Sequence, residues 1–388
     1  MSNSAAAEAL PIRVVFFGMR CAASVPPLAA LLNAGIEVRA VVLPAPSQGP
    51  PVQALLPLAP LPSGSERQEQ PEREMVMLRQ FTAFGEHRKE GDVPILHDPE
   101  ALGLVSLAQS AGLPVLEAAS LRHPALFAAV AAHRPDAIVT ACFPRRLPPA
   151  LLAVPRLGGI NVHPSLLPVG RGPDPVFWTL RRGERRTGAT IHQMDARFDT
   201  GPILAQQAMD VPSGVRAPDL ELQLARLGAG LLVPALHALA SDRASPLPQN
   251  DALATRAPLP KAADYVVPTN LPARWAYNFV RGVAPLGGPL LLHVLSSGES
   301  FSVRDATTCA DEGTLDRPVV RMGTDLLVRF RPGTVLFASA EVDSTLSNML
   351  LEFPLCRNAS AGGAPESCGP QWSGDRSGIF AAPSEKEV

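Results

Sequence analysis

One short run constrains the fold of this chain more than any other: residues 159–168, with the sequence GINVHPSLLP. Successive side chains of a strand point to opposite faces of a sheet. Ile160 and Val162 therefore share one face, while Asn161 and His163 share the other. Pro164 has no N–H group to give to a ladder, so the strand ends there and a turn follows. Open α/β sheets hold their ligands beside polar groups where buried strands end. The run therefore predicts such a sheet, with an amide and an imidazole at a ligand site.

A second run, residues 187–201 (TGATIHQMDARFDTG), predicts an apolar strand followed by a loop that carries Asp199. A carboxylate beside the imidazole would orient the ring and favour its charged form. An amide can stabilise an oxyanion, and an imidazole can move a proton near neutral pH. Asn161, His163 and Asp199 together suit attack on a carbonyl carbon, although a single Asn or His is more often a turn former or a structural residue. His192 lies in the apolar strand, and we expect it to be structural or to support the site indirectly.

Buried-type strands alternate with helices over the first 240 residues, which predicts a doubly wound, mostly parallel α/β sheet. Strands are expected at 12–18, 36–43, 114–116, 135–140, 189–194 and 203–207. Helices are expected at 24–34, 102–111, 123–133, 149–154, 174–182 and 219–240. The turn after the first strand reads GMRC, which lacks the G-x-G-x-x-G fingerprint, so dinucleotide binding is disfavoured.

Composition narrows the class of protein. A chain of 388 residues with 46% hydrophobic residues predicts two domains with real cores. The net charge of −2 gives no global attraction to nucleic acid. Five scattered cysteines favour a reducing compartment, and neither a signal peptide nor a membrane span is indicated, so we expect a cytoplasmic protein. No Cys and His cluster has metal-ligand spacing, so no metal is expected.

The motifs NVHPSLLP, RGPDP, TGATIHQMD and DTGPIL together resemble those of the folate-dependent formyltransferases. That family includes methionyl-tRNA formyltransferase, glycinamide ribonucleotide transformylase and sugar-amine formyltransferases. Its motif is Asn-x-His-x-Ser-Leu-Leu-Pro with a distant Asp-x-Gly, which assigns the family's catalytic triad to Asn161, His163 and Asp199. The resemblance implies transfer of a formyl group from 10-formyltetrahydrofolate to an amine, in a Rossmann-like domain of the formyltransferase type.

The resemblance also implies the folate contacts. The family's folate-contacting turn corresponds to Ser165, Leu166, Leu167 and Pro168. The loop after strand 135–140 is implied to line the pterin end of the folate site, through Cys142, Phe143 and Leu147. The pair Arg145-Arg146 is unusual in this loop, and we expect it to face solvent.

Beyond a Pro-rich linker, residues 268–289 resemble the opening of the small C-terminal barrel of methionyl-tRNA formyltransferases. The resemblance implies a helix at 273–283 and then a small OB-like β-barrel, with strands at 290–295, 301–305, 319–322, 325–330 and 335–338. The expected division is a disordered N-terminus (1–10), a catalytic domain (11–243) with a Pro-rich insert (about 44–94), a linker (244–260), the barrel (261–343) and a disordered tail (344–388). Residues 44–71 of the insert are rich in Pro, Ser and Gly and are expected to form a disordered loop.

The formyl acceptor is less constrained than the reaction. The C-terminal barrel favours initiator methionyl-tRNA. Against this, residues 44–100 carry nine acids and five bases, and residues 251–340 carry eight acids and nine bases, which is a poor surface for phosphates. The alternatives are a small amine such as an amino sugar nucleotide, a hydrolase that releases formate, and an idle folate-binding protein. The sequence does not indicate the oligomeric state.

Overall fold

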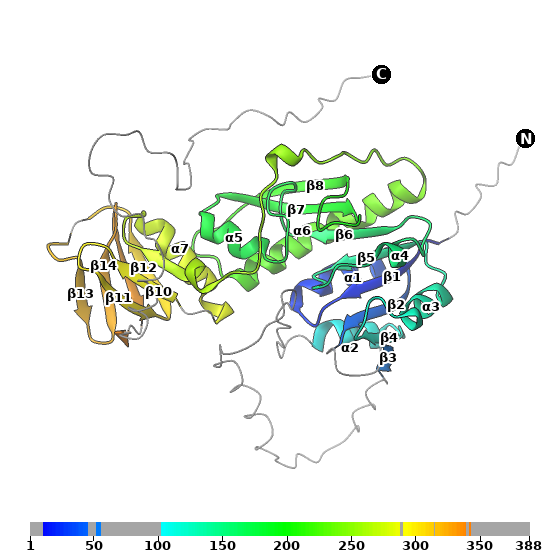
Figure 1. The fold of residues 1–388 in the computed structure, drawn as a ribbon, viewed down its shortest axis with the longest axis horizontal. Coiled ribbons are helices and arrows are strands. Elements are labelled where there is room, and N and C mark those ends of the chain that lie inside the picture. Colours follow the sequence, from blue (N-terminus) through cyan, green and yellow to red (C-terminus); the bar gives the residue numbers. More distant parts are fainter. Residues whose placement is uncertain are drawn as a thin grey trace, which may run out of the picture.

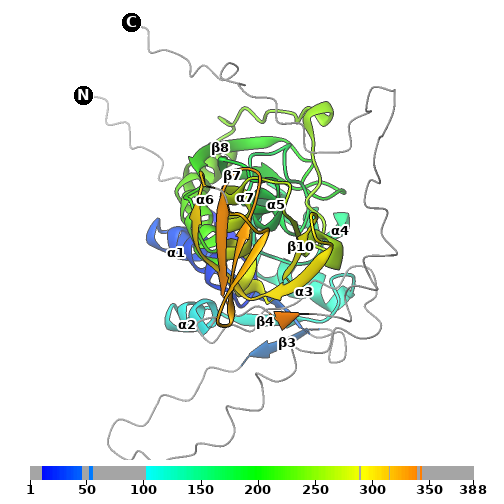
Figure 2. The same ribbon diagram turned by 90° about the vertical axis from the view of Figure 1, so that its left-hand side faces the viewer.

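The fold is taken from a computed structural model, which describes residues 11–45, 52–55, 102–287, 290–313, 315–338 and 341–342. The larger part of the molecule is an eight-stranded sheet covered by helices, and the smaller part carries two further sheets (Figures 1 and 2). The two ends that we expected to be disordered, and most of the Pro-rich insert, lie outside the described residues.

The large sheet has the order β3-β4-β2-β1-β5-β6-β7-β8. Strands β4, β2, β1, β5 and β6 run parallel to one another, whereas β3, β7 and β8 each run antiparallel to a neighbour. The strands are β1 (Arg13–Gly18), β2 (Glu37–Pro44), β3 (Val52–Leu55), β4 (Val115–Ala118), β5 (Ala137–Ala141), β6 (Gly159–His163), β7 (Arg186–Gln193) and β8 (Ile203–Asp210). The predicted mostly parallel sheet is confirmed.

Helices cover both faces of this sheet, as a doubly wound fold requires. One face packs against α1 (Val25–Asn33), α2 (Leu102–Ser110) and α6 (Ala217–Ala240) through a core that includes Leu28, Leu104 and Leu232. The other face packs against α3 (Pro124–Ala132) and α4 (Pro149–Leu152) through Leu126, Val130 and Leu151. The alternating apolar residues of β1 serve both cores, which explains its nearly continuous hydrophobic run.

Strand β3 corrects one prediction. Residues 44–71 were expected to form a disordered loop because they are rich in Pro, Ser and Gly, but Val52–Leu55 pairs antiparallel with β4. The outer edge of β4 would otherwise present unpaired N–H and C=O groups, which favour the addition of a strand. Pairing of this kind depends on tertiary context that local composition does not reveal.

Helix α6 is the central packing element behind the site. By length and composition it could cross a membrane, alone among the helices of the described ranges. In the structure, however, Leu220, Leu224 and Leu232 are buried against the rest of the protein. A methyl group on Gly228 would collide with Val162 of β6, so the helix lies directly on that strand. Its apolar face is therefore part of the core of the larger part.

The smaller part contains α7 (Ala273–Val283) and two four-stranded sheets with the orders β16-β11-β10-β9 and β12-β15-β14-β13. All their pairs are antiparallel except β9 with β10. The strands are β9 (Val266–Pro268), β10 (Leu290–Val294), β11 (Glu299–Val303), β12 (Asp305–Ala310), β13 (Val319–Met322), β14 (Asp325–Arg329), β15 (Thr334–Ala338) and β16 (Glu341–Val342). Strand β12 was not predicted as an element, because most of its side chains are polar or exposed.

One continuous core joins the two parts. Phe177 of α5 (Pro175–Arg182) packs edge-to-face on Phe279 of α7, with ring centroids 5.7 Å apart. Trp275 stacks on Phe279 at 5.4 Å, and its indole N–H donates to the backbone oxygen of Arg181. The smaller part is thus packed against the end of the larger part at α5. The predicted division at 243 and 261 stays a prediction.

A buried carboxylate ties together the amino ends of the parallel strands. Asp136, which is 7% exposed, accepts hydrogen bonds from the backbone N–H and the Nε of Arg13 at 2.9 and 3.0 Å, and from Nε of Arg156 at 2.9 Å. The Arg13 guanidinium, followed by that of Arg156, holds the pKa of Asp136 well below its usual range. The carboxylate therefore fixes the start of β1 against the chain that enters β6.

We expect Asp136→Asn to lower the free energy of unfolding by about 2–4 kcal/mol, because it removes one partner from a buried charge network. Urea denaturation measures the change. The matched control is Asp210→Asn, whose side chain is 89% exposed, and which should change the free energy by less than about 0.5 kcal/mol. Equal effects of the two substitutions would contradict this role for Asp136.

Candidate active site

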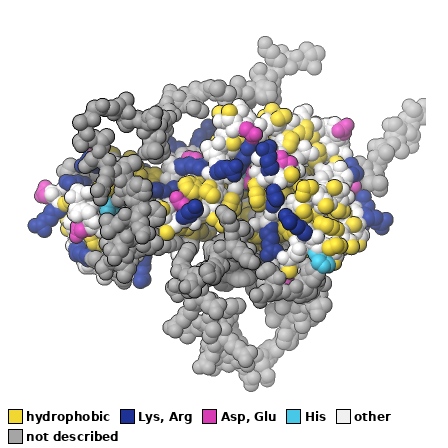
Figure 3. All heavy atoms as spheres, in the orientation of Figure 1, with side chains coloured by type: hydrophobic (Ala, Val, Ile, Leu, Met, Phe, Trp, Pro, Cys, Tyr) yellow, Lys and Arg dark blue, Asp and Glu magenta, His cyan; other side chains and the backbone are white. Residues whose placement is uncertain are grey.

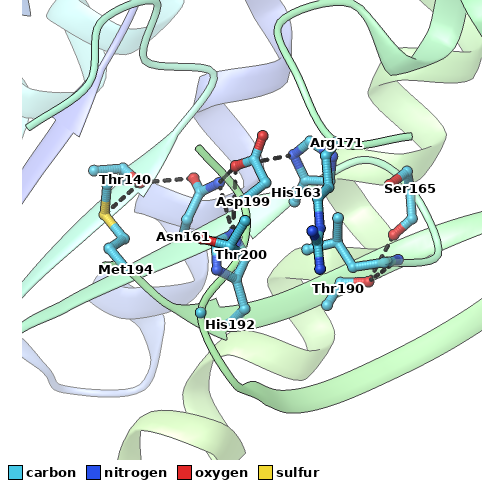
Figure 4. Close-up of polar contacts among 12 residues, drawn as sticks. Thr140, Asn161, His163, Ser165, Arg171, Thr190, His192, Met194, Asp199 and Thr200 are labelled. Atoms are coloured by element: carbon cyan, nitrogen blue, oxygen red, sulfur yellow. Dashed lines mark hydrogen bonds and ion pairs between the residues drawn. The ribbon is translucent and has the colours of Figure 1, made fainter. Parts of the chain in front are cut away.

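Strand β6 carries the two polar side chains that the sequence singled out. In the sheet register, Asn161 lies between Thr140 of β5 and His192 of β7. His163 is the last residue of β6, and Asp199 lies in the loop between β7 and β8. Figure 4 shows Asn161, His163, His192 and Asp199 turned toward one another. The structure thus brings together the three predicted catalytic residues, whose catalytic role stays a prediction.

The amide of Asn161 is oriented by its neighbours. Its Oδ1 accepts a hydrogen bond of 2.6 Å from the hydroxyl of Thr140, so the Nδ2 group must point the other way. Nδ2 lies 3.2 Å from Nε2 of His192 and 3.4 Å from Oδ1 of Asp199. The bond to Asp199 is long, so this N–H group can turn to a ligand oxygen at small cost.

His163 is buried and 4% exposed. Its Nε2 lies 2.9 Å from the backbone oxygen of Gly170. A carbonyl can only accept, so Nε2 carries a hydrogen, and Nδ1 faces Oδ1 of Asp199 at 3.7 Å. Burial lowers the pKa of His163 below its usual value, although Asp199 acts in the opposite direction. The carboxylate thus favours the charged ring as expected, but desolvation is the larger effect, so the net shift of the pKa is downward.

Asp199 is held as an anion. Its Oδ2 accepts a hydrogen bond of 2.9 Å from the N–H of Gly172, and its backbone has the left-handed φ of 55°. Burial raises the pKa of Asp199, but the facing rings of His163 and His192 and the N–H of Gly172 outweigh it and hold the pKa at about 2. The carboxylate is thus ionised throughout the physiological range.

His192 lies inside the network, closer to the site than its prediction as a structural or supporting residue implied. Its Nδ1 lies 2.8 Å from the backbone oxygen of Gln193, which assigns the hydrogen to Nδ1 and leaves Nε2 as an acceptor for Asn161. Nε2 is also 3.6 Å from Oδ1 of Asp199. The ring therefore anchors one of the two N–H bonds of the Asn161 amide.

A segment that was predicted to be a linker crosses the site. We call residues 247–257 the strap. It pairs with β8 through Ile203 and Leu247, and its Thr255 oxygen accepts from the N–H of Arg171 at 2.9 Å. Gln249 donates from Nε2 to the backbone oxygens of Asp199 at 2.9 Å and Gly201 at 2.7 Å. The strap thus clamps the loop that carries the carboxylate.

Sequence reasoning missed Thr140, Arg171 and Gln249 as parts of the site. Arg171 donates from Nε to Oε1 of Gln249 at 2.9 Å and pairs with Asp251 at 2.8 Å. Thr140 could have been found from the strand register, because it is the parallel neighbour of Asn161. The position of Gln249 has no local signal, because its segment reads as a Pro-rich connection.

A pocket opens beside this network. Asn161, His192 and Asp199 line it, together with Thr140, Phe143, Arg145, Arg146, Met194, Asp195, Arg197 and Phe198. Three arginines at one pocket favour a ligand with a negative charge, and the rings of Phe143 and Phe198 supply apolar surface. The pocket therefore suits a ligand that is partly aromatic and partly anionic.

The pterin-side residues implied by the resemblance take different positions. Phe143 lines the pocket, whereas the side chain of Leu147 is fully buried in the core under α3 and α4. Cys142 has a left-handed φ of 54° at the end of β5. Arg146 is exposed as expected, but Arg145 is half-buried and donates to the backbone oxygens of Ala45, Ala118 and Ala119.

The predicted folate-contacting turn lies behind His163. The hydroxyl of Ser165 donates to the backbone oxygen of Val169 at 2.7 Å, and Leu167 is buried. A cis peptide bond joins Leu167 to Pro168. This turn positions Gly170, whose oxygen bonds the imidazole. Neither Ser165 nor Leu166, Leu167 or Pro168 lines the pocket described above, so their contact with a folate stays a prediction.

Taken together, the site contains an oriented amide donor, a neutral imidazole and an ionised carboxylate beside one pocket. Such a set can stabilise an oxyanion and accept a proton from a nucleophile. Within the described part of the chain, no three His, Cys, Asp or Glu residues are grouped so that they could hold a metal ion.

Comparison with known proteins gives matches that agree with this chemistry. The family described as formyl transferase matches residues 67–236. A methionyl-tRNA formyltransferase of Synechococcus sp. is 41% identical over 180 residues, which cover 46% of this chain and 56% of that protein. The methionyl-tRNA formyltransferase of Roseiflexus sp. is 39% identical over 56% of this chain and 69% of that protein. That of Pelobacter propionicus is 34% identical over 66% of this chain and 81% of that protein. The match to the Synechococcus protein spans little more than half of its length.

Solved structures show similar folds. A Helicobacter canadensis N-formyltransferase, in complex with folinic acid and dTDP-3-aminofucose, has a TM-score of 0.56 at 13% identity, covering 85% of this chain and all of that one. The sugar 3N-formyl transferase WlaRD has a TM-score of 0.55 at 12% identity, covering 86% and 98%. At these identities the likeness concerns the fold alone.

We expect Asp199→Asn to lower the pKa of His163 further, because it removes the charge that stabilises the imidazolium form. The ring should then stay neutral to a lower pH than in the native protein. NMR titration of the histidine rings measures this shift, with Asp210→Asn as the control of equal charge change. An unchanged or raised pKa of His163 in Asp199→Asn would show that the two groups are not coupled.

Gln249→Ala should lower the free energy of unfolding by about 1–3 kcal/mol, because two backbone oxygens of the Asp199 loop lose their donor. Urea denaturation gives the value. Gln207→Ala, at an exposed position of β8, serves as the matched control and should be nearly neutral. A neutral result for Gln249→Ala would mean that the strap does not hold this loop.

Proposed function

This chain belongs to the formyltransferase family, and on that premise we propose that it transfers a formyl group from 10-formyltetrahydrofolate to the amino group of initiator methionyl-tRNA. The observation that carries the proposal is the convergence of Asn161, His163 and Asp199, of which Asn161 and Asp199 line one pocket. The curated relatives that match this chain at 34–41% identity are methionyl-tRNA formyltransferases, which supports this acceptor.

Asn161 stabilises the oxyanion in the proposed reaction. The acceptor amine attacks the formyl carbon, and the carbonyl electron pair moves onto the oxygen. The N–H of Asn161 that now makes the long bond to Asp199 turns to this oxygen. Thr140 and His192 keep the amide in the required orientation, so little reorganisation is needed when the charge develops.

His163 moves the proton. The attacking amine must lose a proton, and Nδ1 of the neutral ring can accept it, because Nε2 already donates to Gly170. Asp199 then faces an imidazolium at 3.7 Å and stabilises it. When the bond from the formyl carbon to N10 of the folate breaks, the same proton passes to N10. The products are a formamide and tetrahydrofolate, and His163 is neutral again.

The pocket supports the folate donor. Phe143 and Phe198 can pack against a pterin or benzoyl ring, and Arg145, Arg146 and Arg197 can attract a carboxylate tail. Ser165, Leu166, Leu167, Pro168, Cys142 and Leu147 remain proposed folate contacts on the resemblance alone. The proposal also includes an OB-like arrangement of the C-terminal sheets and a cytoplasmic location.

The charge of the C-terminal region favours a second candidate acceptor, a small amine such as an amino sugar nucleotide. Nine bases against eight acids in residues 251–340 give no general attraction to phosphates. Arg329 is the last residue of β14, and Arg331 lies beyond it, so the two arginines do not share a face of this strand.

Figure 3 shows Lys and Arg side chains gathered over the middle of the larger part. A tRNA would therefore contact the catalytic part more than the smaller one.

The test measures formyl transfer from 10-formyltetrahydrofolate to initiator methionyl-tRNA by the native protein. We expect Asn161→Ala and Asp199→Asn each to lower kcat by about 10²–10³-fold, because each removes a group that acts at the transition state. Asp210→Asn is the surface control and should keep the native rate.

Two parallel reactions distinguish the alternatives. One replaces the tRNA with a dTDP-linked amino sugar, and the other contains no acceptor and follows formate release. Transfer to the amino sugar alone would keep the chemistry and overturn the acceptor. Formate release without transfer to either acceptor would overturn the proposed function in favour of hydrolysis.

A further inference from the structure

Two cysteines lie at the carboxyl ends of neighbouring parallel strands. Cys142 follows β5 directly, and Cys21 lies three residues beyond the end of β1. The register of the two strands pairs Gly18 with Ala141, so the segments that follow β1 and β5 leave the sheet next to each other. Neither thiol takes part in the network around Asp199, and both cysteines are free and partly exposed.

Ser24 connects the two strand ends. Its hydroxyl lies 3.5 Å from Sγ of Cys21 and donates a hydrogen bond of 3.0 Å to the backbone oxygen of Ala141. The N–H of Met19 donates to the same hydroxyl at 3.1 Å, which fixes the turn after β1. Because Ala141 is the chain neighbour of Cys142, these contacts hold the two cysteines side by side.

The two thiols differ in their chemistry. A hydrogen bond from the Cys142 thiol is the main cause that lowers the pKa of Cys21 to about 6, with a further contribution from Ser24. The same bond, together with burial, raises the pKa of Cys142. Cys21 is thus a thiolate near neutral pH, while Cys142 keeps its proton. A thiolate next to a protonated thiol is the arrangement of a nucleophile and a resolving cysteine.

We propose that Cys21 and Cys142 form a reversible dithiol–disulfide site that is oxidised by hydroperoxides. The thiolate of Cys21 attacks one peroxide oxygen, the O–O bond breaks, and the leaving oxygen takes a proton to become water or an alcohol. Cys21 is then a sulfenic acid. The sulfur of Cys142 attacks the sulfur of Cys21, an S–S bond forms, and hydroxide leaves with the Cys142 proton as a second water. The two sulfurs lose two electrons in total, and the peroxide gains them.

Neither cysteine is among the residues that line the pocket, but the pair adjoins it. Cys142 directly precedes Phe143, whose ring lines the pocket and packs edge-to-face on Phe17 of β1 at 5.3 Å. A bond between Cys21 and Cys142 would fix the start of this loop to the turn after β1. Oxidation would therefore act on the pocket wall rather than on Asn161, His163 or Asp199. The inference is independent of which acceptor the protein uses.

The experiment treats the full-length native protein with hydrogen peroxide at pH 7, blocks the remaining thiols with N-ethylmaleimide, and maps tryptic peptides by mass spectrometry. The expected product is a peptide of residues 21–39 linked to a peptide of residues 123–145, lighter by two hydrogens than their sum. Dithiothreitol should separate the two. In the Cys309→Ser control, which removes a thiol on β12, the linked peptide should form as in the native protein.

Two variants separate the steps. Cys21→Ser and Cys142→Ser should each lower the yield of the linked peptide by at least about tenfold. In Cys142→Ser the sulfenic acid of Cys21 has no resolving thiol, so dimedone should label residue 21 more strongly than in the native protein. The proposal is overturned if both thiols of the peroxide-treated native protein are still alkylated, or if dimedone labels neither cysteine of the pair in any variant.

Discussion

The site depends on the buried negative charge of Asp199. A carboxylate in a low-dielectric interior is costly unless it is paired and hydrogen-bonded, so every group around it is constrained at once. The N–H of Gly172 binds one oxygen, and the rings of His163 and His192 face the other. Asp199 itself has a left-handed backbone, and Gln249 of the strap donates to its backbone oxygen. Sheet, loop and strap thus meet at this one residue.

The sequence was sufficient to predict the architecture of the larger part, because its strands are buried on both faces and its helices repeat at a clear period. The helix at 219–240 and the strand at 159–163 are examples, and the structure has both within two residues. Strands β3 and β12 were missed for a physical reason. Each depends on pairing with a partner strand, β3 with β4 and β12 with β15. Strand β3 has only four residues, and most side chains of β12 are polar or exposed, so neither can be recognised alone.

The sequence predicted the central residues of the candidate site but not the residues that support them. Strand alternation put Asn161 and His163 on one face, and the structure shows them there with Asp199. Thr140 required the strand register, which local sequence does not contain. Gln249 required the path of the strap, whose composition indicates a connection rather than a functional segment. The charge of His163 also escaped prediction, because it depends on the balance between burial and one nearby carboxylate.

The neutral state of His163 makes the proposed chemistry easier to understand. A ring that was already protonated beside Asp199 could not accept the proton of an attacking amine. A neutral ring can, and its protonation turns a buried pair with one net negative charge into a pair with no net charge, in which Asp199 faces the imidazolium at 3.7 Å. Burial thus keeps the imidazole ready to accept, while Asp199 stabilises the proton after it arrives. The acidity of the amine in the tetrahedral intermediate therefore drives proton transfer to the ring, against the desolvation that lowers the pKa of His163.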